Sequence, residues 1–206
     1  MSISPIAEAI KIPDDKTSLL SALMRLSPNA PIDMITRLAL KDAEFCERIL
    51  DILFQNRRPP SITESIIHDS VRSLGLERVR CLFICHSISS AFSSVKLEDF
   101  DIGYFWTSCF RRAFAAFAVA EKLEYPDPYE AFLAGFLSDI GTLLLGARFP
   151  NLCVHFKNTR SRPAEIRANI ERILTGVSHD EEVKRSGITK LIPPRVVQAI
   201  VNHLEP

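Results

Sequence analysis

Residues 131–147 form a long apolar stretch, AFLAGFLSDIGTLLLGA, in which the only ionisable side chain is Asp139. Such a run of aliphatic, aromatic and small residues favours a helix that is buried on several sides. A carboxylate inside a buried helix is costly unless a hydrogen-bond donor, a cation or a metal ion lies beside it. The partner of Asp139 therefore constrains both the fold and the function of the chain.

A membrane span is the competing interpretation of this stretch. Seventeen residues is the lower limit for a span, and Asp139 lies in the middle of the run. A buried helix of a soluble protein explains the same residues at lower cost. Residues 1–11 do not show a cationic start followed by an apolar run, so we expect no signal peptide.

The charge balance excludes a general attraction to nucleic acid or to an anionic membrane. The 206 residues contain 25 lysines and arginines against 25 aspartates and glutamates. The chain also has five cysteines, an odd number scattered through apolar segments, which favours a reducing cytoplasm. The Cys81 and Cys85 pair precedes His86, but its flanking residues indicate core packing rather than a metal site.

The periodicity is helical almost throughout, and glycine is scarce, so we predict an all-α fold of many helices without a significant sheet. Helices are expected over residues 17–26, 31–40, 43–55, 61–74, 76–92, 104–123, 128–147, 149–158 and 163–174, and again after residues 178 and 193. The polar segment 93–101 is expected to link two halves.

Several helix starts are marked by capping residues. Asp42 can cap the third helix, and Asp127 followed by Pro128 is typical of a helix start. Ser61 with Glu64 and Ser178 with Glu181 both have the spacing of a capping box.

Five segments resemble HDOD domains, which are relatives of the HD phosphohydrolases. SITESIIHDSVRSLGLERVRCLFICHSI is similar to the family's "LLGL-x-R-V-R-x-L" region, and FWTSCFRRAFAAFAVAEKL to its "FW-x-H-S" helix. AFLAGFLSDIGTLLL resembles "AFLAGLLHDIGKLLL", and GVSHDEEV resembles "G-x-D-H-x-E-x-G". PPRVVQAIVNHLEP resembles the closing pattern. The resemblance covers residues 19–206, with an N-terminal half at 19–95 and an HD-like half at 102–206, whereas 1–18 match poorly.

The resemblance implies a degenerate metal site. In the catalytic parent group, a histidine, a His-Asp pair and a later aspartate hold a divalent ion that activates water. The first histidine falls on Ser108 and the second on Ser138, whereas the aspartate is kept as Asp139. A serine hydroxyl is a poor ligand for such ions. His179 and His203 match later family histidines, and Thr142 stands where a lysine is common; we therefore expect no catalytic residues, no metal and no cofactor.

The sequence leaves the partner of Asp139 open. A hydroxyl, a backbone amide, Arg111, Arg112 or His203 could each satisfy its carboxylate. The two arginines are also the candidate anion contacts of this pocket. His179 could equally be a surface residue in a first helical turn, and His203 near a helix C-terminus needs no functional role.

The leading interpretation is a non-catalytic regulatory module that binds other signalling proteins in the bacterial cytoplasm, as the resemblance implies. One alternative is a small-molecule sensor that holds a nucleotide in the vacated pocket. A second alternative is a divergent phosphohydrolase with a metal site rebuilt from Asp139, His179, His203 and either Asp180 or Glu181. We expect neither a nucleic-acid nor a membrane partner; the protein partner and the oligomeric state stay open.

Overall fold

The helical prediction is confirmed. The computed structural model describes residues 18–19, 21–23, 25–27, 29–54, 59, 61–93, 97, 100–159, 162–190 and 192–202, and over these ranges it has helices and no strand. The chain divides into two compact units, which we call the N-terminal unit (12–90) and the C-terminal unit (91–206, grouped with 1–11). Each unit is described by itself.

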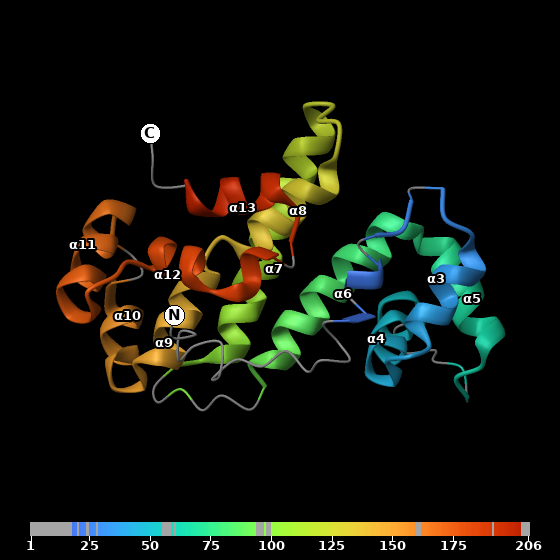
Figure 1. Cartoon of the computed structure of the whole chain (residues 1–206), viewed down its shortest axis with the longest axis horizontal. Coiled ribbons are helices and arrows are strands. Elements are labelled where there is room, and N and C mark those ends of the chain that lie inside the picture. The colour runs from blue at the N-terminus through green and yellow to red at the C-terminus, as the bar shows by residue number, and fades with distance from the viewer. Residues whose placement is uncertain are drawn as a thin grey trace. The chain divides into compact units, whose positions relative to one another are not determined.

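Within the described part of the N-terminal unit, the helices with defined bounds begin at α3. They are α3 (Ile32–Ala39), α4 (Ala43–Phe54), α5 (Glu64–Leu74) and α6 (Leu76–Ala91) (Figure 1). Phe45 of α4 and Phe83 of α6 are fully buried and meet edge to face, with ring centroids 4.7 Å apart. This pair fixes the spacing between α4 and α6 in the core of the unit.

Capping residues determine where α4 and α5 begin. Asp42 accepts a hydrogen bond from the Phe45 amide at 3.0 Å, which confirms the predicted start of α4. The predicted capping box at Ser61 is wrong, because Thr63 caps α5 by accepting from the Ile66 amide at 3.3 Å. Gly75 closes α5 with φ of 79°, a conformation that favours glycine.

The C-terminal unit contains the remaining helices. They are α7 (Ile102–Lys122), α8 (Pro128–Leu137), α9 (Ile140–Arg148), η1 (Pro150–Leu152), α10 (Cys153–Thr159), α11 (Ala164–Thr175), α12 (His179–Arg185), η2 (Gly187–Lys190) and α13 (Pro194–Val201) (Figure 1). Two predicted starts are confirmed: Asp127 caps α8, and Ser178 with Glu181 forms a complete capping box on α12.

Helices α7 and α8 pack along one another at very short range. A Cβ added to Gly135 of α8 would lie 2.8 Å from the Arg112 carbonyl oxygen and 2.9 Å from the Ala113 Cα. Only glycine fits there, so the C-terminal half of α8 is pressed directly onto the α7 backbone. This close approach brings the end of α8 next to Arg112.

One detail of the C-terminal unit differs from the sequence-based predictions. The predicted single helix over 128–147 is interrupted, because Ser138 and Asp139 form a turn between α8 and α9. Elsewhere in the unit, Phe114 of α7 is 63% exposed. In α13 the buried residues are Val196 and Ile200.

The stretch Pro128–Arg148 is the one described segment that is long and apolar enough to span a membrane, judged by length and composition alone. Most of it is buried within the protein. Core helices of soluble proteins have the same composition, so this observation is weak support for a membrane span.

All five cysteines are free thiols and buried. Cys81 and Cys85 lie on α6 among core residues, consistent with packing. Burial, and to a smaller extent the charge of Asp42, raises the pKa of the Cys46 thiol to about 11. Cys46 is therefore a neutral thiol at pH 7, and it donates to the Ala39 carbonyl at 3.3 Å.

Candidate functional site

The residues matched to the family's metal site gather within the C-terminal unit. Ser108 and Arg112 lie one turn apart on α7, so they share a helix face. Ser138 and Asp139 form the turn after α8, and His179 is the first residue of α12. His203 lies outside the described residues. Arg111 is exposed on α7.

Asp139 is held by two arginines. Its Oδ2 lies 3.1 Å from Nη1 of Arg112, and its Oδ1 lies 3.3 Å from Nη1 of Arg167 on α11. Of the candidate partners that the sequence left open, the structure thus shows Arg112. Arg167 was not among them. Both carboxylate oxygens face guanidinium groups, which supply the positive charge that this carboxylate, only 14% exposed, needs.

Ser138 contributes to the same contact through its hydroxyl. The Arg112 Nε donates to the Ser138 Oγ at 3.0 Å, and this hydroxyl donates to the Gly135 carbonyl at 3.1 Å. Arg112 also lies 3.4 Å from the Cys109 sulfur through Nη2. Ser138, which the resemblance matches to a family histidine, therefore orients Arg112.

His179 is 1% exposed, so its alternative interpretation as a surface residue is wrong. Its Nε2 lies 2.8 Å from Nη2 of Arg167, which can only donate. The Nε2 must therefore accept, and the ring proton is on Nδ1, which contacts Oε2 of Glu171. The same carboxylate oxygen accepts from the His179 amide at 2.9 Å. Asp180 Oδ1 lies 3.2 Å from Nε2 on another side.

Arg167 and Glu171 complete the cluster from one face of α11. They are one helical turn apart, with Nε and Oε1 separated by 3.8 Å, and their side chains are 9% and 0% exposed. The sequence indicated only an amphipathic helix here. Buried charges at spacing i, i+4 look the same in a sequence as a solvated pair, so the pattern alone could not reveal them.

The residues present do not fit the divalent ion of the catalytic parent group. Ser108 and Ser138 stand at the two positions that the resemblance assigns to histidine ligands, and Asp139 and His179 direct their lone pairs at guanidinium nitrogens. An arginine always carries its charge, so an ion here would meet two fixed positive groups. The arrangement instead links α7, the turn after α8, α11 and α12 through paired charges.

A further buried carboxylate lies on α12. Glu182 is fully buried, and its Oε2 accepts from Arg148 Nη1 at 3.0 Å. Burial raises the pKa of Glu182 above its ordinary value of 4.5, and the charge of Arg148 opposes this rise. Its folded-state pKa is therefore above its unfolded value, so its contribution to stability is fully present below pH 4.5 and is lost as pH rises through the folded pKa.

We therefore expect Glu182→Gln to lose this pH dependence. The free energy of unfolding of the wild type minus that of the variant should fall as the pH rises above 4.5, measured by urea unfolding at a series of pH values. Glu181→Gln is the matched control. Its difference in free energy of unfolding from the wild type should change with pH in the opposite direction, because the Ser178 amide and Arg172 lower the pKa of Glu181. Equal pH profiles for the wild type and Glu182→Gln would contradict the expectation.

Comparison with known proteins agrees with the family resemblance and with the helical fold. The family model of the HDOD domain matches residues 15–206, close to the predicted 19–206. A solved structure from Shewanella amazonensis SB2B, described as a candidate phosphohydrolase, is similar with a TM-score of 0.76 and 23% identity. The similarity covers 98% of this chain and 71% of that one, and it shows a shared fold. A search of curated proteins found no match.

Proposed function

We propose that the chain, which belongs to the HDOD family, is a non-catalytic regulatory module that binds other proteins in bacterial signal transduction in the cytoplasm. The observation that carries this proposal is the pairing of both Asp139 oxygens with Arg112 and Arg167. A catalytic centre of the parent type needs that carboxylate as a metal ligand. Without that ligand, the helical scaffold is left with binding as its function.

An apolar groove in the C-terminal unit supports a binding role. It has a volume of about 550 Å³ and lies between α7, α8 and α13. Small side chains keep it open, and Val119 and Leu123 on its α7 wall are 57% and 74% exposed. Its walls include Ala115, Ala131, Ala134 and Ala199.

We assign to this groove an amphipathic helix of a partner protein. A groove between helices accepts the apolar face of another helix through anchors spaced three and four residues apart. One polar pair, Glu130 with Arg195 at 3.7 Å, lies beside the apolar walls, and Arg195 is 72% exposed. Glu130 and Arg195 can thus pair with charged residues that flank the apolar face of the partner helix.

The test first identifies the partner by placing a photo-crosslinking residue at position 123 in cells of the source organism. The identified partner is then purified, and its affinity for the protein is measured. We expect Val119→Glu with Ala199→Glu to weaken that affinity at least about tenfold, because a buried charge costs more than 1.4 kcal/mol. Ile173→Glu is the control, since Ile173 on α11 is 83% exposed and outside the groove. Equal affinity of the groove variant and the control would contradict the proposal.

The two alternatives from the sequence have less support. A nucleotide phosphate near Ser108 and Ser138 would have to compete with Asp139 for Arg112, which is 36% exposed. A divergent phosphohydrolase would need Asp139 and His179 to exchange their contacts with Arg167 for a metal ion. Hydrolysis of a phosphodiester by the purified protein with Mn²⁺ or Zn²⁺, abolished by Asp139→Asn, would overturn the non-catalytic proposal.

A further inference from the structure

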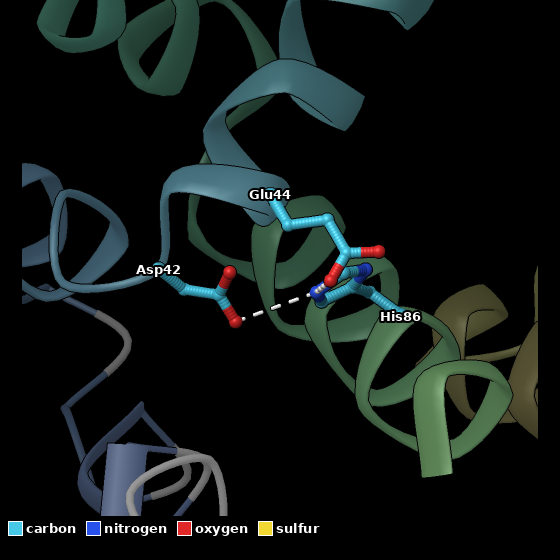
Figure 2. Close-up of side chains that lie close together, drawn as sticks. All are labelled: Asp42, Glu44 and His86. Atoms are coloured by element: carbon cyan, nitrogen blue, oxygen red, sulfur yellow. Dashed lines mark ion pairs between the residues drawn. The ribbon is translucent and has the colours of Figure 1, made fainter. Parts of the chain in front are cut away.

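A second cluster of possible metal ligands lies in the N-terminal unit and includes none of the residues matched to the family's metal site. Asp42 and Glu44 stand at the start of α4, and His86 lies on α6. Figure 2 shows the two carboxylates converging on one edge of the imidazole ring. One ligand atom from each residue lies within 4.8 Å of the other two.

The cluster is held in place by the fold. Asp42 uses Oδ1 to cap α4 by accepting from the Phe45 amide at 3.0 Å, which directs Oδ2 toward His86. The His86 ring packs against Phe45 and Phe83, with ring centroids 5.7 and 6.2 Å apart. The side chains of Asp42 and His86 are only 7% and 4% exposed, whereas Glu44 is 55% exposed. Asp42 and His86 are therefore already held in position for an ion, and the exposed Glu44 can rotate toward it from solvent.

The distances fit an ion better than a salt bridge. The His86 Nε2 lies 3.3 Å from Asp42 Oδ2 and 3.9 Å from Glu44 Oε2. A charge-assisted hydrogen bond is shorter, at about 2.7–2.9 Å. Bonds of about 2.0–2.1 Å to a tetrahedral zinc ion place neighbouring ligand atoms about 3.3–3.4 Å apart. The distance from His86 to Asp42 matches this ligand spacing. A small rotation of the exposed Glu44 side chain would bring the distance from His86 to Glu44 to the same value.

The kinds of ligand atom also favour a divalent transition-metal ion. Two carboxylate oxygens and one imidazole nitrogen lie together in a partly buried place. A nitrogen ligand together with two carboxylates suits a first-row transition metal, because Mg²⁺ and Ca²⁺ prefer a shell of oxygen atoms.

We propose that Asp42, Glu44 and His86 bind a divalent transition-metal ion, with Zn²⁺ as the best fit and water as the fourth ligand. The site joins the start of α4 to α6 within the N-terminal unit. Binding there would add a cross-link between two helices that already meet through Phe45 and Phe83. The site is independent of the proposed protein-binding function.

The test is calorimetric titration of ZnCl₂ into the reduced, tag-free protein. We expect one Zn²⁺ per chain and a rise in melting temperature that saturates with zinc. Glu44→Gln and Asp42→Asn should each weaken binding by at least about 10–100-fold, the range that even outer-shell changes produce. Both variants should fold, because Glu44 is exposed and asparagine caps helices as well as aspartate. His155→Ala is the matched control, since His155 is exposed on α10.

Co²⁺ gives an independent readout. The wild type should show the visible absorption of tetrahedral Co²⁺, and His86→Ala should not. Zinc binding that is absent, or that survives unchanged in Glu44→Gln and Asp42→Asn, would overturn the proposal. So would a metal-free protein in which NMR shows a protonated His86 ring at neutral pH that zinc does not displace.

Discussion

Arg167→Ala is expected to destabilise the protein by about 3–5 kcal/mol, the cost of breaking a buried ion pair on one side. The side chain of Arg167 is 9% exposed and lies between Asp139, His179 and Glu171. Its removal leaves Oδ1 of Asp139 and the Glu171 carboxylate without this buried cation. The Glu171 side chain is 0% exposed, so water cannot readily replace the lost cation there.

Arg172→Ala provides the matched control on the same helix. Arg172 pairs with Glu181 at 3.0 Å, but its side chain is 46% exposed. An exposed pair contributes at most about 1 kcal/mol, so this variant should unfold at nearly the wild-type urea concentration. If Arg167→Ala is no less stable than Arg172→Ala, the Asp139 cluster does not hold the helices together.

A double variant separates the charge from the packing. Asp139→Asn removes one of the carboxylates that Arg167 neutralises, so its effect and that of Arg167→Ala should not add. The cost of the pair should fall short of the sum of the single costs by about 0.5–3 kcal/mol. Additive costs would mean that Arg167 stabilises the fold without pairing to Asp139.

The sequence predicted those helix starts that depend only on residues close to one another in the chain. Asp42, Asp127 and the Ser178–Glu181 pair each act within four positions of themselves, so their capping roles were predictable. The wrong start at Ser61 has the same origin. Thr63 offers the same hydroxyl two residues later, and only the geometry of the chain decides between them.

Contacts between distant segments were not predictable from this one sequence. The cluster around Asp139 joins α7, the turn after α8, α11 and α12, and the side chains of Arg167 and Glu171 carried no mark of their burial. The turn at Ser138 and Asp139 was hidden for a related reason. Every flanking residue is compatible with a buried helix, so the apolar pattern continues straight through the interruption.

Gly141→Ala is expected to cost about 3 kcal/mol or more, at or above the upper end of the range for overpacking a core. Gly141 lies on α9, where it is pressed against the first residue of α12. An added Cβ would overlap the His179 carbonyl oxygen and lie 2.7 Å from the carbonyl carbon. The obstacle is backbone rather than a flexible side chain, so α12 must move away from α9.

This displacement would also carry His179 away from Arg167, because the clashing carbonyl belongs to the same residue. Gly103→Ala is the control: its nearest new contact is the Asp101 side chain at 3.4 Å, in the exposed first turn of α7. That variant should be neutral or more stable by up to about 1 kcal/mol, because alanine favours helix over glycine. Urea unfolding of both variants measures the difference. If Gly141→Ala matches Gly103→Ala in stability, then α9 and α12 are not packed through Gly141, and the geometry of the Asp139 cluster must be different.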